Sequence, residues 1–280
     1  MTSTSQLSRR RRLSDYKSSS MYDLRLVAFT AVTLAVSLGT AYSIIYGTYL
    51  DTSDPLLAHL AHPLALTNYW ARKSNVLNVY FIKKAWGWTS AAFLLLWATT
   101  TPSQRTLSRV MQWLTATACW LTFTTWFFGP AVIDRVNLAS GGDCFVHLPS
   151  GDLITVPTDY CFTKSTVTPI SHPDIFTSSL VLPEGWSGIP RLRRGHDVSG
   201  HVFLLTMSVL FLADQLSRSL RFGQSSFWNK LAMAANVVLI SIWLFASVTT
   251  SVYFHSPFEK VTGYVLGLVS FAVTQTSVFS

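Results

Sequence analysis

The sequence predicts an all-α integral membrane protein with six transmembrane helices and a long luminal loop between the third and the fourth. Of its 280 residues, 49% are hydrophobic and only 12% are charged, whereas a soluble domain carries about 25% charged residues. The apolar residues also gather in runs of about 19 residues or more, the length that crosses a hydrocarbon layer ~30 Å thick. Composition and run length together predict a protein that resides in the bilayer.

Six apolar runs account for the predicted spans, and they fall at about 24–48, 79–100, 109–129, 198–216, 231–254 and 260–279. Five runs are long enough to cross the bilayer, and the second crosses if Lys83 and Lys84 extend to the interface. The sixth run holds Gly263 and Gly267 in a small-xxx-small pattern. This pattern predicts close packing against another helix, with ordinary glycine usage in membranes as the alternative. The predicted membrane domain is residues 24–280.

Residues 1–23 form a serine-rich and basic segment that includes four consecutive arginines at 9–12. Such a segment predicts a disordered cytosolic tail. The net charge of +8 indicates contact with anionic lipid rather than nucleic acid, because no basic domain with interleaved aromatic residues could hold a strand. Basic residues in short loops favour a cytosolic tail, and an even number of spans then places both termini in the cytosol.

The predicted luminal loop, residues 129–197, is rich in proline, glycine and serine and has no helical period. Loops of this length are usually functional or disordered, and we expect this one to be an ordered cap over the membrane surface. The alternating segment at 152–156 could pair in a small hairpin. Cys144 and Cys161 lie in the same loop, so they could form a disulfide in an oxidising compartment, but the sequence leaves their pairing open.

Two histidines lie at the ends of neighbouring predicted spans. His201 falls in the first turn of the fourth span, and His255 follows the fifth. Because consecutive spans are antiparallel, both histidines are expected on the luminal face. Ionisable groups at such depths are costly unless they serve a site or a partner. A single histidine at a helix end is more often bonded to a backbone carbonyl, but the pair favours catalysis.

The residues before the fourth span are typical of an anion site. Asp197 or Ser199 can cap the helix, whose free N–H groups and positive dipole end favour a phosphate. Gly200 would let that phosphate approach the backbone closely. We expect phosphate contacts from Ser199 and Gly200, with His196 and Asp197 around them. Three nearby arginines could form a phosphate clamp or a membrane-surface patch: Arg191, Arg193 and Arg194.

Glu259 stands four residues after His255. Its carboxylate could hold one ring nitrogen of the histidine and leave the other free to attack a substrate. The alternative is an interfacial carboxylate paired with Lys260 or with the next helix end. The predicted catalytic set is therefore His201, His255 and Glu259, and the sequence shows no ligand cluster that demands a metal.

Ser199-Gly200-His201, followed at a distance by His255 and an acidic residue, resembles the second and third motifs of the lipid phosphate phosphatase superfamily. A wider set of residues is similar to the fat storage-inducing transmembrane (FIT) family, including its fungal inositol-metabolism members. That set comprises the six apolar runs and residues 195–205, 253–257 and 260–263. A bare Ser-Gly-His triplet would mean little, whereas the two extended segments in this topology are specific.

The resemblance implies a membrane enzyme of the endoplasmic reticulum that cleaves the diphosphate bond of fatty acyl-CoA in the lumen. It further implies that His255 attacks phosphorus to form a phosphohistidine, that His201 acts as acid and then base, and that Glu259 orients His255. No metal or other cofactor enters this scheme. The implied partners are fatty acyl-CoA and membrane lipids including neutral lipid, and the implied roles are lipid-droplet formation, phospholipid synthesis and reticulum homeostasis.

Two departures from the superfamily pattern leave the phosphate contacts open. The first motif, a lysine with an Arg-Pro pair, is absent, and the arginine expected before the third motif is replaced in the segment 247–250. The three arginines before the fourth span are the candidates to replace them. The alternative function is a non-enzymatic protein that binds diacylglycerol or triacylglycerol and partitions neutral lipid. Only the enzyme requires the two imidazoles to lie close together.

Overall fold

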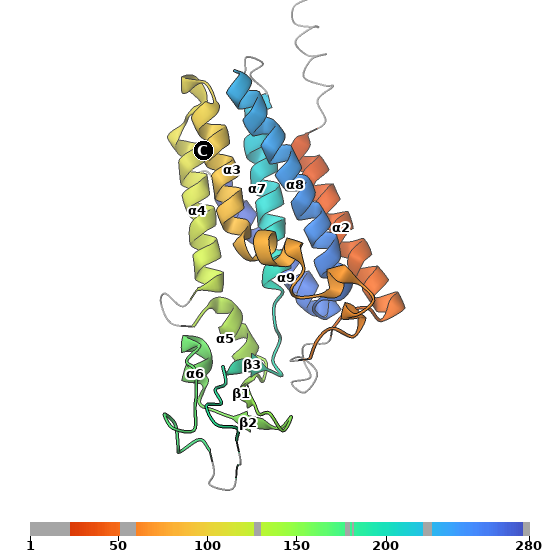
Figure 1. Cartoon of the computed structure of the whole chain (residues 1–280). Helices are drawn as coiled ribbons and strands as arrows, with labels where there is room; N and C mark the ends of the chain where they lie inside the picture. Colours follow the sequence, from red (N-terminus) through yellow and green to blue (C-terminus); the bar gives the residue numbers. More distant parts are fainter. Residues whose placement is uncertain are drawn as a thin grey trace, which may run out of the picture.

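The computed structural model describes residues 23–50, 60–125, 130–176, 180, 182–220 and 226–276. The predicted tail, residues 1–23, lies outside this part of the chain except for Asp23. The described chain is mostly helical, and its long helices run side by side with a smaller cap at one end (Figure 1). The helices at the six predicted runs are α2 (Leu24–Tyr46), α3 (Ala85–Thr99), α4 (Leu107–Thr124), α7 (Gly200–Leu220), α8 (Phe227–Tyr253) and α9 (Pro257–Thr274).

Among the described helices, α2, α7 and α8 are long and apolar enough to cross a membrane. Helix α3 has 15 residues, and α4 and α9 have 18 each. A π-helical turn at Leu77–Phe81 and a 3-10 turn at Ile82–Lys84 lead directly into α3, which lengthens the helical backbone there. The structure thus gives a helical membrane protein with three candidate spans, and the full six-span topology stays a prediction.

Helix α7 lies at the centre of the helical domain, in contact with α2, α3, α8 and α9 (Figure 1). Its side chains from Val202 to Ser217 are all buried. A helix that is apolar on nearly all sides is stable only inside a packed structure or a bilayer. The N-terminal turn of α7 is consequently held between the helices and the cap.

Close backbone contact fixes α9 against α7. A Cβ atom added to Gly263 would lie 2.5 Å from the carbonyl oxygen of Ser199, and one added to Gly267 would lie 2.7 Å from that of Phe203. Neither position has room for a side chain, because the neighbouring atoms belong to the backbone. The small-xxx-small pattern of the sixth run thus packs one helix on another, as predicted.

The cap contains α5 (Val132–Ala139), α6 (Thr158–Thr163) and an antiparallel sheet in the order β2-β1-β3. Strand β1 (Asp143–His147) pairs with β2 (Leu153–Thr155), which confirms the predicted hairpin. Strand β3 (Arg191–Arg193) pairs with the other edge of β1. The prediction of an all-α protein is therefore only partly correct, since the cap is built around a sheet.

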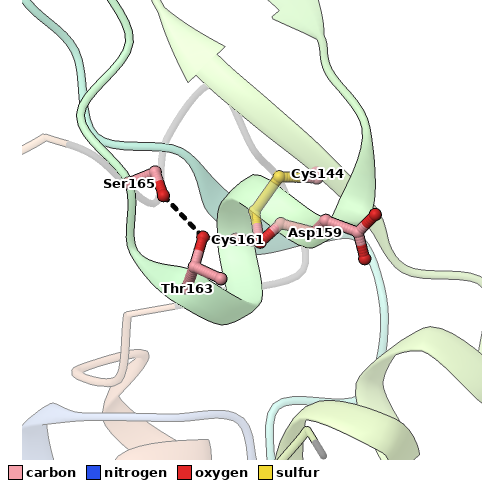
Figure 2. Close-up of a disulfide and its surroundings, with 5 residues drawn as sticks. All are labelled: Cys144, Asp159, Cys161, Thr163 and Ser165. Carbon is pink, nitrogen blue, oxygen red and sulfur yellow. Dashed lines mark hydrogen bonds between the residues drawn. A yellow bond between two sulfur atoms is a disulfide. The ribbon is translucent and has the colours of Figure 1, made fainter.

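A disulfide between Cys144 and Cys161 joins β1 to α6, with 5.9 Å between the Cα atoms (Figure 2). Cys144 and Cys161 belong to the buried core of the cap, together with Val146, Val156 and Val167. Figure 2 also shows Thr163 and Ser165 hydrogen-bonded 2.6 Å apart where α6 ends. The pairing that the sequence left open is a disulfide within the cap.

Candidate active site

The first turn of α7 carries His201 into the region where the helices meet the cap. Ser199 caps this helix, because its Oγ accepts a hydrogen bond from the Val202 amide at 3.4 Å and its carbonyl accepts one from the Phe203 amide at 3.0 Å. Ser199 is buried, and Ser199 rather than Asp197 therefore acts as the cap. A helix start fixed in this way gives the His201 imidazole a defined direction.

His255 lies in the short connection between α8 and α9. Its backbone adopts the left-handed conformation, with φ of 60°. Directly after it, Ser256 caps α9, Pro257 occupies the first turn, and the Ser256 amide donates to Oε2 of Glu259 at 2.7 Å. This capping box holds the chain that carries His255.

Two carboxylates face one nitrogen of the His255 ring. Nδ1 lies 3.5 Å from Oε2 of Glu259 and 3.9 Å from Oδ2 of Asp197. Glu259 is buried, and its Oε1 also accepts a hydrogen bond from the Asp197 amide at 3.2 Å. Glu259 therefore links His255, the start of α9 and the segment before α7. The other ring nitrogen, Nε2, points away from this carboxylate pair by the geometry of the ring.

Burial raises the pKa of the Asp197 carboxyl, and the nearby charge of Glu259 raises it further, while His255 and Arg193 lower it. The charged form of Asp197 is therefore disfavoured in the folded protein, because its carboxyl group is buried beside that of Glu259. Such crowding of like groups in a cleft is typical of functional sites.

His201 and His255 line the same cavity, which has a volume of about 260 Å³. The predicted residues Asp197 and Arg193 also line it. Part of its wall is apolar, from Leu50, Ile82 and Phe254. The structure thus brings the two predicted catalytic histidines together with a carboxyl group and a guanidinium group from the segment before α7.

Two lysines that no sequence pattern marks, Lys73 and Lys83, also line this cavity, together with Asn75 and Asn78. Burial lowers the pKa of Lys73, and the charges of Arg193 and Arg191 lower it further. These cations therefore crowd around one small volume. Lys83 stands at the edge of an apolar run, where a lysine is typical of the membrane interface. Lys73 lies in a segment without a hydrophobic pattern, so nothing in the sequence indicates its place.

The remaining predicted phosphate-binding residues lie around the cavity rather than in its wall. Arg191 lines a second, adjoining cavity. Arg194 lies over the Phe145 ring, 4.7 Å from its centroid, and is 3.8 Å from Asp143. A Cβ atom added to Gly200 would make an ordinary contact with Ile133 at 3.8 Å. The Oγ of Ser199 is already engaged in capping α7.

His196 stabilises the approach to α7. Its Nε2 is 2.8 Å from Oγ1 of Thr262, its amide donates to Ser140 at 2.6 Å, and its ring contacts Phe258. It thereby ties α9 to the cap. Among the described residues, no group of three or more His, Cys, Asp or Glu side chains could hold a metal ion, and a metal-independent reaction stays a prediction.

Comparison with known proteins gives the chain a family. A family model described as fat storage-inducing transmembrane protein matches residues 66–233 and 217–275. The chain belongs to the FIT family. The resemblance seen in the two histidine segments is therefore confirmed over most of the sequence.

Curated relatives of this FIT-family chain include proteins from fungi and vertebrates. It is 29% identical to acyl-coenzyme A diphosphatase fit1 of Schizosaccharomyces pombe over 90% of this chain and 83% of that protein. It is 30% identical to acyl-coenzyme A diphosphatase FITM2 of Xenopus tropicalis, over 74% of this chain and 71% of that protein. It is 26% identical to fat storage-inducing transmembrane protein 1 of Homo sapiens, over 80% of this chain and 68% of that protein. No solved structure matches.

Proposed function

We propose that this chain is a membrane hydrolase of the endoplasmic reticulum that cleaves the diphosphate bond of fatty acyl-CoA. The products are acyl 4′-phosphopantetheine and adenosine 3′,5′-bisphosphate. The observation that carries the proposal is the single cavity lined by His201 and His255, with carboxylates behind one histidine and cations in the wall. The relatives named acyl-coenzyme A diphosphatase support the same reaction.

His255 is the nucleophile in this proposal, because its Nδ1 faces Glu259 and Asp197 and its Nε2 is left for the substrate. Nε2 forms a bond to phosphorus, and the bond from that phosphorus to the bridging oxygen breaks. The bridging oxygen leaves with the other half of the substrate and takes a proton from His201. His201 then removes a proton from water, whose oxygen bonds to phosphorus as the phosphohistidine bond breaks.

Lys73, Lys83 and Arg193 line the cavity where the diphosphate would lie. Cations at such a place stabilise the charge that develops on the phosphoryl oxygens, most strongly where water is excluded. They supply the positive charge that the first superfamily motif provides elsewhere. Of the three predicted arginines, Arg193 takes this role at the reacting phosphorus.

The apolar part of the cavity, from Leu50, Ile82 and Phe254, gives the acyl chain a path toward the bilayer. The substrate would therefore enter with its chain in the membrane and its diphosphate at the surface. The family resemblance links this activity to lipid-droplet formation, phospholipid synthesis and homeostasis of the reticulum.

The disulfide of the cap supports a luminal site, because disulfides persist in oxidising compartments. In this topology the helices α2, α3, α4, α7, α8 and α9 cross the membrane, and the cap covers the luminal face. The charge bias of the short loops favours cytosolic termini.

Hydrolysis by purified protein tests the function. The full chain, incubated with oleoyl-CoA in detergent, is expected to release adenosine 3′,5′-bisphosphate. His201→Ala and His255→Ala should each lower kcat by about 100-fold or more, the contribution typical of proton transfer and nucleophilic groups. His172→Ala, a matched change in the cap where His172 contacts Ser171 and Tyr160, should keep wild-type turnover.

Equal turnover by wild type and either cavity variant would contradict the catalytic roles. Absence of turnover in the wild type, combined with saturable binding of diacylglycerol or triacylglycerol, would favour the alternative of a lipid-partitioning protein. The two hypotheses can be distinguished in this way because only the hydrolysis reaction depends on the imidazoles of His201 and His255.

A further inference from the structure

A second cavity of about 400 Å³ adjoins the first on the side of the cap. Its walls come from α5, from the end of α6 and from β3. The volume falls in the range of small-molecule sites. Lys73, Arg193 and Asp197 line both cavities, so one extended ligand can occupy the two together.

Four basic and two acidic side chains line this second cavity. Lys164 and Arg191 line it without lining the first cavity, and they add to the two cations that the cavities share. Arg191 and Arg193 stand two residues apart on β3, which places both side chains on one face of the strand. Leu192 lies between them and packs on the core of the cap. The strand therefore presents a pair of guanidinium groups to the cavity.

Lys164 is held in place by local structure. It ends α6 in the left-handed conformation, with φ of 53°, where glycine or asparagine is the usual residue. The disulfide fixes the same helix through Cys161, which also lines the cavity. The fold thus keeps a lysine at a backbone position that disfavours it.

Asn137 and Asp134 on α5 give the cavity polar groups of another kind. Asn137 is buried, and Gly142 and Gly195 pack so closely on it that a Cβ atom at either would overlap it. Burial raises the pKa of Asp134, with Lys164 opposing the rise. An asparagine amide can donate to a ring nitrogen of a base and accept from its amino group, and a carboxylate can accept from the amino group.

We propose that this second cavity binds the 3′-phosphorylated nucleoside end of the CoA substrate, with Lys164 and Arg191 contacting the 3′-phosphate. The proposal rests on the proposed function and adds the orientation of the substrate. The diphosphate lies between the two histidines and the wall that Lys73 and Arg193 form in both cavities. The acyl-pantetheine end extends along the apolar side of the histidine cavity, and the nucleoside lies beneath the cap. The chain should then discriminate between CoA esters with and without the 3′-phosphate.

The test compares oleoyl-CoA with its 3′-dephospho analogue on the purified full chain. Wild type should show a kcat/KM at least about tenfold higher for the 3′-phosphorylated ester. A hydrogen bond between charged groups changes affinity by about this factor. Lys164→Ala and Arg191→Ala should each move this ratio toward one, chiefly through KM for oleoyl-CoA. Arg191→Lys should retain part of it. Arg72→Ala, an exposed cation beside Lys73, should keep the wild-type ratio.

Direct titration supplies an independent readout. Adenosine 3′,5′-bisphosphate should bind wild type more tightly than adenosine 5′-monophosphate, and Lys164→Ala should remove the difference. A wild-type ratio near one, or variants with an unchanged ratio, would overturn the inference and leave the proposed function standing. Failure to hydrolyse either ester would overturn the proposed function instead, and the titration would then decide whether the cavity binds the 3′-phosphate.

Discussion

His255 combines the proposed nucleophilic side chain with a strained backbone. A non-glycine residue in the left-handed region costs about 1–2 kcal/mol, and such strain persists mainly where a site requires it. With φ of 60°, His255 lets the chain turn from the end of α8 into the capping box of α9 within a few residues. That turn directs Nδ1 toward Glu259. The strain therefore follows from the position that the histidine must occupy.

Replacement of His255 separates strain from chemistry. His255→Gly and His255→Ala should both lose turnover, but the glycine variant should be more stable than the alanine variant by about 1 kcal/mol, because glycine adopts this conformation freely. Thermal unfolding of the two variants in detergent measures the difference. An alanine variant as stable as the glycine variant would contradict a left-handed residue 255.

Asp197 should show a conflict between stability and activity. Its pKa in the folded protein is raised above the ordinary value of 3.8, so its stabilising contribution is complete below about that pH and is lost as pH rises through the raised pKa. Asp197→Asn should therefore have a higher Tm than wild type near neutral pH, with the difference shrinking toward pH 4. Its turnover should fall about tenfold or more, because His255 loses a charged partner.

Tm measured for both proteins across this pH range checks the sign. A difference that is constant with pH would show that the carboxyl group does not titrate as described. Unchanged turnover would remove Asp197 from the support of His255.

At the scale of elements, the contact between α9 and α7 sets the position of the turn that carries His201. Gly263 lies against the carbonyl of Ser199, two residues before His201. Gly263→Ala should destabilise the protein by about 1–3 kcal/mol through overpacking and should lower turnover, since it displaces the start of α7. Gly87→Ala is the matched control, because nothing lies within 4 Å of the added Cβ, and it should stabilise α3 by about 0.5–1 kcal/mol.

Thermal unfolding should show a lower Tm for Gly263→Ala and a slightly higher Tm for Gly87→Ala. Oleoyl-CoA turnover should fall only in Gly263→Ala. A Gly263→Ala protein with wild-type stability would indicate that α9 sits farther from α7. The sixth run would then carry ordinary membrane glycines.

The helices could be predicted from sequence because long apolar runs mark them, and the histidine pair could be predicted because it stands at their ends. Strand β3 was missed, since Arg191–Arg193 is too short to show a period and pairs with β1 across a long separation in sequence. Lys73 and Lys83 were missed for a related reason. Only the packed structure brings the connection after α2 to the start of α7, so no local pattern marks these lysines as part of the site.

At the scale of the whole molecule, the helical domain supplies the histidines and the cap supplies Arg191 and Arg193. The Cys144–Cys161 disulfide joins residues 17 positions apart in the sequence of that cap and should contribute about 3 kcal/mol. Cys144→Ser and Cys161→Ser should therefore make the cap more sensitive to limited proteolysis and lower turnover. Cys119→Ala, at the free cysteine of α4, should change neither property. Equal protease resistance with and without the disulfide would contradict this role.

In the proposed reaction, His255 forms a covalent bond to phosphorus inside the cavity that it shares with His201. Rapid mixing with oleoyl-CoA, an alkaline quench that preserves phosphohistidine, and peptide mass spectrometry test it directly. We expect a phosphoryl-linked adduct on the peptide containing His255 in the wild type, slower formation of that adduct in His201→Ala because the leaving oxygen is no longer protonated, and no adduct in His255→Ala. An adduct on another residue, or full turnover by His255→Ala, would contradict it.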